Sequence, residues 1–238
     1  MNRRTFAALA AALALALPFA ASAADAPGGK MKIGIIGSGR IGGTLGELWA
    51  KQGYDVMFSS LDLAHDKELA AKTGARAGTP AEAAAFGEVL LVSVPYPALA
   101  QIGRDYAASI KGKVVLDTSN PIQARDGDMA IAAREKGAGT ASAELLPGAR
   151  LVRAFNSVGW SKLQSENHRA GERVAIPLAG DDIGAVQVAR KLVEDAGFEP
   201  VLVGGLPAAK RFDVGTPVFG KALTAAELRK ALDIPSHQ

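Results

Sequence analysis

The chain has 238 residues, of which 48% are hydrophobic and 21% are charged, values typical of a folded protein and not of a disordered one. It contains no cysteine, which excludes disulfides, thiolate nucleophiles and cysteine metal sites, and its three histidines (His65, His168 and His237) lack the spacing of metal ligands, so we expect no metal. The formal net charge is +3, and no cluster of Lys and Arg is interleaved with aromatic residues, which argues against a nucleic-acid partner.

The first residues have the pattern of an export signal. Arg3 and Arg4 precede an uncharged run rich in alanine and leucine over 5–24, and Ala21-Ser22-Ala23 has the small residues of a cleavage site. We therefore predict a twin-arginine-like signal peptide over 1–23. A general secretory signal is the first alternative, and an uncleaved membrane anchor is the second. With either signal we expect an exported, periplasmic protein that has no membrane span after cleavage. If the signal is not used, we expect a cytoplasmic protein.

The next feature combines an apolar strand with three glycines. Residues 33–36 precede Gly37, Gly39 and Gly42, which have the spacing G-x-G-x-x-G, and a helical pattern follows at once. This order of strand, tight turn and helix is the fingerprint of a dinucleotide-binding site, with an ordinary structural turn as the alternative. Gly37 permits the turn, Gly39 lets a pyrophosphate approach the backbone, and Gly42 lets the helix pack closely on the strand. The helix start then offers unpaired N–H groups to the phosphates.

Strands and helices alternate along the rest of the chain. Apolar runs predict strands over 32–37, 55–58, 75–77, 89–94, 113–117, 150–154, 174–179 and 201–203. Amphipathic runs and capping signals predict helices over 41–52, 67–72, 79–87, 97–108, 129–135, 142–146 and 183–196, and a C-terminal helix after Thr224. The alternation predicts an α/β fold, a doubly wound parallel sheet of the Rossmann type. We expect a linker over 24–30 and a single domain over 31–238, in which the part after Arg150 extends the sheet.

The end of the second strand indicates which dinucleotide is bound. An acid at this place selects NAD by accepting a hydrogen bond from the ribose 2′-hydroxyl. Here the place is held by Ser59 and Ser60, whose hydroxyls can donate to a 2′-phosphate. Asp62 lies just beyond and counts against a phosphate, whereas His65 and Lys67 could supply positive charge. We therefore predict NADP(H) as the cofactor, with ordinary turn chemistry as the alternative role of both serines.

Ligands of an open parallel sheet bind outside the carboxyl ends of the strands. This rule places three strand ends, 94–96, 120–121 and 154–156, around one crevice. Asn120 and Asn156 could each hydrogen-bond a carboxamide or a substrate there, or could cap a turn.

The motifs, taken in order, resemble those of the NADP oxidoreductases that act with coenzyme F420, a deazaflavin. The resemblance covers nearly all of the chain after the signal, and a ferric-reductase domain of membrane proteins shares the same nucleotide module. The segments that carry it are 35–42, 56–60, 92–95, 117–121, 152–156, 197–200 and 204–206. Position by position, it implies pyrophosphate contacts at Ser38, Arg40 and Ile41, a serine facing the 2′-phosphate at Ser60, and nicotinamide-side contacts at Val94, Pro95 and Ala154. The family places an arginine directly after that serine, and this chain has Leu61 there.

The resemblance implies hydride transfer between NADPH and a second redox carrier, a deazaflavin of the F420 type or a flavin. No Ser-His-Asp set and no paired acids stand out, so we assign no catalytic residue. Reduction of a simple ketone or imine would need a proton donor, for which Tyr96, Lys162 and His168 are the candidates, although ordinary structural roles are favoured for each. The alternatives are an NADPH-dependent reductase of ferric iron, flavin or imine, and a non-catalytic NADP-binding sensor. The expected partners are a small-molecule redox acceptor and a second copy of the chain, since nicotinamide enzymes often form homodimers.

Overall fold

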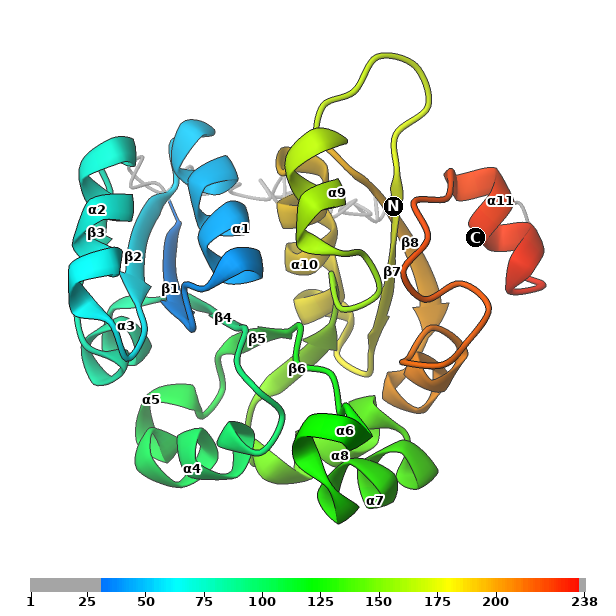
Figure 1. The fold of residues 1–238 in the computed structure, drawn as a ribbon, viewed down its shortest axis with the longest axis horizontal. Coiled ribbons are helices and arrows are strands. Elements are labelled where there is room, and N and C mark those ends of the chain that lie inside the picture. Colours follow the sequence, from blue (N-terminus) through cyan, green and yellow to red (C-terminus); the bar gives the residue numbers. More distant parts are fainter. Residues whose placement is uncertain (1–30, 236–238) are drawn as a thin grey trace, which may run out of the picture.

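The computed structural model describes residues 31–235, so the predicted signal peptide and linker lie outside the described part. Eight strands form one sheet in the order β3-β2-β1-β4-β5-β6-β7-β8 (Figure 1). The strands are β1 (Lys32–Ile36), β2 (Asp55–Ser59), β3 (Arg76–Ala77), β4 (Val89–Val92), β5 (Val114–Asp117), β6 (Arg150–Arg153), β7 (Ala175–Gly180) and β8 (Glu199–Gly204). The helices are α1 (Arg40–Lys51), α2 (Leu63–Thr73), α3 (Pro80–Phe86), α4 (Ala98–Asp105), α5 (Ala107–Ile110), α6 (Gln123–Asp126), α7 (Asp128–Lys136), α8 (Ala138–Leu145), α9 (Trp160–Ser165), α10 (Ile183–Asp195), the 3₁₀ helix η1 (Leu206–Arg211) and α11 (Ala225–Ala231).

The fold confirms the predicted α/β class, with one correction to the direction of the strands. Strands β1 to β6 pair in parallel, but β6 and β7 pair antiparallel, so β7 and β8 run against the other six. The predicted parallel sheet therefore holds for six strands, and the reversal of β7 and β8 was not predicted because an apolar strand that is buried on both faces has the same composition in either direction. The part after Arg150 extends the same sheet, as expected.

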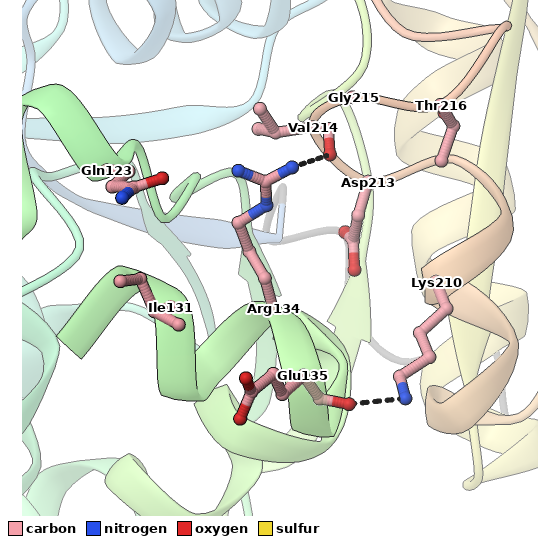
Figure 2. Close-up of a pocket in the computed structure, with 9 residues that line it drawn as sticks. All are labelled: Gln123, Ile131, Arg134, Glu135, Lys210, Asp213, Val214, Gly215 and Thr216. Carbon is pink, nitrogen blue, oxygen red and sulfur yellow. Dashed lines mark hydrogen bonds between the residues drawn. The ribbon is translucent and has the colours of Figure 1, made fainter. Parts of the chain in front are cut away.

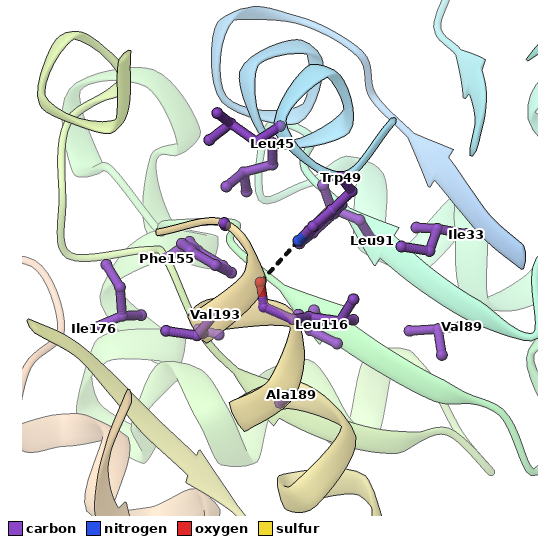
Figure 3. Packing of buried hydrophobic residues seen from close by; sticks show 14 of the residues in the cluster. Ile33, Leu45, Trp49, Val89, Leu91, Leu116, Phe155, Ile176, Ala189 and Val193 are labelled. Carbon is purple, nitrogen blue, oxygen red and sulfur yellow. Dashed lines mark hydrogen bonds between the residues drawn. The ribbon is translucent and has the colours of Figure 1, made fainter. Parts of the chain in front are cut away.

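Helices cover both faces of the sheet, and each face has its own core (Figure 1). On one face, α1, α9 and α10 pack over the strands, and on the other face α4 and α8 do so. Trp49 of α1 is fully buried, and its Nε1 donates to the Leu192 carbonyl of α10 at 2.8 Å (Figure 3). The ring of Phe155 lies edge-on to Trp49, with 6.1 Å between the ring centroids. These contacts join the first helix to the C-terminal part of the sheet.

Several helices differ from the sequence-based expectation because local turns start or stop them. The predicted helix over 97–108 is broken at Tyr106, which has φ −115° and ψ 19°, so it becomes α4 and α5. Helix α2 starts at Leu63, four residues early, because Asp62 caps it by accepting the His65 N–H. Helix α7 ends at Lys136, and the φ of 98° at the following Gly137 lets α8 begin directly afterwards. Helices α6 and α9 and the 3₁₀ helix η1 were not predicted.

Candidate dinucleotide-binding site

The loops after β1 and β4 meet at the point where the strand order reverses. Strand β1 pairs with β2 on one side and with β4 on the other, and the chain forms β2 and β3 before it crosses to β4. A Cβ atom on Gly37 would lie 2.3 Å from the Ser93 carbonyl oxygen, and Gly37 has φ 99°, so only glycine fits where the two loops touch. This crevice, called the cleft below, is the standard ligand position of an open α/β sheet.

The glycine loop leaves bare backbone at one place and packs tightly at another. A Cβ atom on Gly39 would meet nothing within 4 Å, whereas one on Gly42 would lie 2.1 Å from the Gly37 carbonyl oxygen. The N–H groups of Gly37 and Ser38 donate to the Ser59 carbonyl at 2.8 and 3.0 Å. The donors left for a phosphate are therefore those at the start of α1, whose first turn has no side-chain cap and no acidic residue. The residues present thus fit a pyrophosphate beside Gly39.

Two cavities meet at this loop and share Gly39, Ser93, Val94 and Pro95. The cavity toward β2 measures about 430 Å³ and has mainly apolar walls. The cavity toward β5 and α9 measures about 310 Å³ and has polar and aromatic walls. The remaining residues of the first cavity include Ser60, Leu61, Pro80, Ala98, Ile102 and Tyr106, and those of the second include Arg40, Ile41, Asn120, Ile122, Arg125 and Trp160. A long ligand with a ring at each end and phosphates at its centre fits this shape.

The two serines at the end of β2 have different surroundings. Ser59 is fully buried, and its hydroxyl donates to the Ile35 carbonyl at 2.5 Å, so the side chain faces β1 and not the cavity. Ser60 is half-buried and lines the apolar cavity. Its hydroxyl oxygen lies 3.0 Å from both carboxylate oxygens of Asp66, a fully buried residue of α2. The Ser38 hydroxyl also donates to Asp66 Oδ1.

The other polar residues near Ser60 are arranged differently from the expectation. Asp62 is exposed, and its carboxylate caps α2, so the acid that contacts the serines is Asp66, which the sequence analysis did not single out. His65 reaches the glycine loop, with Nε2 at 3.2 Å from the Ser38 carbonyl oxygen. Lys67 is exposed on α2. The spacing from Asp62 to Asp66, four residues along one helix, was the available signal that a second acid lies near this place.

A buried arginine organises the strand ends beside the second cavity. Arg153 on β6 is fully buried, and its Nη1 lies 2.8 Å from Asp117 Oδ2 while its Nη2 lies 3.2 Å from Asp213 Oδ1. Burial alone would lower the pKa of Arg153, but the carboxylates of Asp117 and Asp213 outweigh it, so the pKa is raised and the guanidinium stays charged. Burial raises the pKa of Asp213 above its ordinary value despite Arg153. The sequence pattern of β6 did not indicate this charge cluster.

The two asparagines of the crevice contact one another. Asn120 Nδ2 donates to the Asn156 carbonyl at 2.7 Å. The backbone turns at Phe155, the residue before Asn156. Phe155 has φ 59°, a left-handed conformation that is rare for a bulky residue, and burial of its ring between Trp49 and Phe198 holds it there. Asn156 is only 2% exposed, and its Oδ1 has no hydrogen-bond partner within residues 31–235. Asn120 therefore presents the accessible side of this pair to the cavity.

Residues 32–121, from β1 through the turn after β5, match the family described as NADP oxidoreductase coenzyme F420-dependent. Over this segment the chain is similar to that family. The family resemblance inferred from the motifs is therefore confirmed here, and the family consists of NADP-dependent oxidoreductases.

Individual relatives extend the likeness beyond residues 32–121. The metalloreductase STEAP3 of Rattus norvegicus is 27% identical over 195 residues, which are 81% of this chain and 38% of that protein. The chain spans less than half the length of the curated relatives it matches. A crystal structure of the hypothetical protein SMa0349 from Sinorhizobium meliloti is similar with TM-score 0.71 and 25% identity, covering 82% of this chain and 95% of that one. A protein described as an F420-dependent NADP reductase from Arthrobacter sp. FB24 has the same fold with TM-score 0.61 and 19% identity, covering 76% of this chain and 87% of that one.

The predicted site residues divide into two groups. Eight of them line the two cavities, and the other five are buried behind the cavity walls. The lining residues are Gly37, Gly39, Arg40, Ile41, Ser60, Val94, Pro95 and Asn120. The buried ones are Ser38, Gly42, Ser59, Ala154 and Asn156. Trp160 and Arg125 also line the second cavity and were not predicted. Trp160 is 37% exposed, and the guanidinium carbon of Arg40 lies 4.9 Å from its ring centroid.

The three candidate proton donors do not line either cavity of the cleft. Tyr96 is fully buried, and this burial raises its pKa to about 12. Lys162 is exposed, with Nζ at 3.5 Å from Glu166 Oε1. His168 lies beside Gln52, which follows the C-terminal end of α1, the end opposite the glycine loop. Within residues 31–235 no group of three or more acidic, histidine or cysteine side chains could hold a metal ion, and no helix is long and apolar enough to cross a bilayer.

A third cavity, of about 420 Å³, lies between α7 and the segment 210–216 (Figure 2). Lys210 Nζ donates to the Glu135 carbonyl at 2.6 Å across it, and Arg134 Nη2 lies 3.4 Å from the Val214 carbonyl oxygen. It shares no lining residue with the two cavities of the cleft. Asp213 lines this cavity and contacts Arg153, so it connects the third cavity to the buried charge cluster.

Proposed function

We propose that this chain is an oxidoreductase that transfers a hydride between NADPH and a second redox carrier, a deazaflavin of the F420 type. The observation that carries the proposal is the pair of cavities joined at the open backbone of Gly39. Adenosine would occupy the apolar cavity toward β2, the pyrophosphate would lie against the start of α1, and the nicotinamide would enter the cavity toward β5. The match of residues 32–121 to a family of NADP oxidoreductases supports the same assignment.

The residues around the second cavity bind and orient rings and supply no acid or base. Val94 and Pro95 form one wall, Trp160 and Ile122 form another, and Asn120 provides an amide. When both carriers are bound, the hydride chemistry belongs to their own rings. The protein then needs only to hold the two rings in contact and to exclude water. The position of Tyr96, Lys162 and His168 outside the cleft agrees with a reaction that takes no proton from the protein.

A panel of acceptors tests this proposal. Purified protein with NADPH should reduce a deazaflavin in steady state, measured by loss of absorbance of both carriers. NADPH oxidation with ferric chelates, flavin or a cyclic imine alone would instead support a reductase of that acceptor. Tight NADPH binding without turnover on any acceptor would support a sensor. A protein that binds neither NADPH nor NADH would refute the dinucleotide site itself.

We also propose that the chain is exported through a twin-arginine signal over residues 1–23. This rests on Arg3, Arg4 and the small-residue cleavage site, which lie outside the described residues. The twin-arginine route carries folded proteins, which suits an enzyme that binds its nucleotide before export. Fusion of residues 1–30 to a reporter should give export that is lost when Arg3 and Arg4 are changed to lysine. Export that survives this change would indicate the general secretory route. A homodimer is proposed as well, to be tested by sedimentation of the mature chain.

A further inference from the structure

A buried carboxylate that the proposed NADPH site does not explain lies behind one wall residue of the apolar cavity. Asp66 is 0% exposed and lies directly behind Ser60, the cavity residue at the end of β2. Both of its oxygens are 3.0 Å from the Ser60 hydroxyl oxygen, and Oδ1 also accepts from the Ser38 hydroxyl. A carboxylate at this depth places negative charge beneath the position where a dinucleotide presents its ribose 2′ group.

The hydrogen bonds of Ser60 determine what its hydroxyl can offer to a ligand. A serine hydroxyl has one proton to donate and two lone pairs that accept. The one proton of Ser60 has two acceptors within reach, the Asp66 carboxylate at 3.0 Å and the Asp62 carbonyl at 3.2 Å, and the Asp62 N–H donates to the Ser60 oxygen at 3.0 Å. The proton of Ser38 is likewise donated to Asp66. In this arrangement neither hydroxyl has a proton free for a 2′-phosphate, whereas the remaining Ser60 lone pair can accept from a ribose 2′-hydroxyl.

We propose that Asp66 is a specificity-determining residue that weakens binding of the 2′-phosphate and so narrows the preference of this chain for NADPH over NADH. The inference rests on the proposed function, because it assumes that the adenosine end of the dinucleotide occupies the cavity lined by Ser60. A 2′-phosphate carries roughly −1.5 to −2 charges at pH 7, so a buried carboxylate one hydroxyl away opposes it directly. The residue directly after Ser60 is Leu61, which is 104% exposed and adds no compensating charge.

Calorimetric titration of NADP⁺ and NAD⁺ into the mature chain tests this role without any acceptor. The variant Asp66→Asn keeps the shape of the side chain and removes its charge. We expect it to tighten NADP⁺ relative to NAD⁺ by about tenfold or more, the effect of removing one like charge roughly 6 Å away at a partly exposed site. Asp66→Thr, which is also uncharged and can still accept a hydrogen bond, should shift the ratio in the same direction. Circular dichroism would establish that both variants are folded.

Asp62→Asn is the matched control. It removes the same charge four residues away, but the Asp62 side chain is exposed and caps α2, a role that asparagine also fills. Its affinity ratio should stay within about twofold of wild type, since an exposed charge is screened by solvent. In the double variant Ser60→Ala with Asp66→Asn, the part of the NADP⁺ gain that comes from the Ser60 hydroxyl should be lost, whereas the part that comes from removing the Asp66 charge should remain.

The outcomes separate this inference from the proposed function. If wild type binds both dinucleotides and Asp66→Asn and Asp66→Thr leave their affinity ratio unchanged, the role of Asp66 is refuted while the dinucleotide site stands. An equal shift in Asp62→Asn would also refute it, because the effect would then be one of general charge. If wild type binds neither dinucleotide, the proposed function and this inference fail together.

Discussion

Arg153 Nη1 lies 2.8 Å from Asp117 Oδ2, and both side chains are completely buried at the carboxyl ends of neighbouring parallel strands. The same pair holds the turn beyond β5 from two directions. Asp117 Oδ1 accepts the Ser119 N–H at 2.8 Å, and Arg153 Nη1 donates to the Ser119 carbonyl at 2.6 Å. The turn leads directly to Asn120, which lines the cavity of the cleft, so the ion pair positions one wall of the proposed nicotinamide site.

Replacement of Arg153 should therefore lower the unfolding free energy more than replacement of Arg150, the other arginine on β6. Arg153→Met leaves Asp117 as a buried charge without its partner, which costs about 3–5 kcal/mol of unfolding free energy. Arg150→Met breaks the bond to Asp182, in which both side chains are about 40% exposed, and should cost much less because solvent screens an exposed ion pair. Urea unfolding followed by circular dichroism measures both values. Equal losses in the two variants would show that the buried pair has no special role.

The overall fold was largely predictable because its signals are local. The glycine spacing, the buried β4 and the capping box of Thr79 and Glu82 each act through residues close in sequence, and the structure has all three. The direction of β7 was not predictable, because pairing with β6 is a long-range choice between two geometries that bury the same residues. The breaks at Tyr106 and Gly137 depend on single backbone conformations that periodicity does not record.

Acid should weaken the contribution of the Arg150–Asp182 pair to stability. The pKa of Asp182 is lowered from 3.8 to about 2, first by the hydrogen bonds from Arg150 and then by the Ala185 N–H. Because the folded pKa lies below the unfolded value, this stabilisation is fully present above about pH 4 and is lost as the pH falls toward about 2. The difference in melting temperature between wild type and Asp182→Asn, which keeps a capping oxygen on α10, should therefore shrink over that range. A difference that stays constant with pH would contradict the assignment.

The candidate site was predictable only in part, since charge and exposure depend on the tertiary fold. Spacing placed Gly39 and Ser60 at the cleft, where the structure has them. Spacing did not show that the Ser59 hydroxyl faces β1, nor that Asp66 contacts Ser60 although Asp62 is closer in sequence. Trp160 follows an unpredicted turn and reaches the second cavity from a distant part of the chain.

Substitution at Gly39 should block the dinucleotide without harming the fold. Gly39 has φ −67°, outside the left-handed region that favours glycine, and a Cβ there meets no protein atom within 4 Å. Gly39→Val should therefore melt near the wild-type temperature but bind NADP⁺ at least about tenfold more weakly, because the side chain fills the place of the pyrophosphate and removes its charge-assisted hydrogen bonds.

Gly42→Ala is the structural counterpart of this variant. Its Cβ would lie 2.1 Å from the Gly37 carbonyl oxygen, so it should lower the unfolding free energy by about 1–3 kcal/mol through overpacking. Thermal unfolding and calorimetric titration of both variants distinguish the two roles. A well-folded Gly39→Val protein with unchanged affinity would remove the basis of the proposed site.

Introduction of positive charge beside Ser60 should give strong selection for the 2′-phosphate. Leu61 is fully exposed and lines the apolar cavity, so Leu61→Arg can be accommodated without repacking the core. We expect NADP⁺ to bind about tenfold more tightly and NAD⁺ to change little, since an arginine pairs with phosphate in a bidentate manner. Leu63→Arg, which adds the same charge at the start of α2, is the control and should have a smaller effect. Titrations at low and high salt complete the measurement, because a gain due to phosphate pairing must decrease as ionic strength rises.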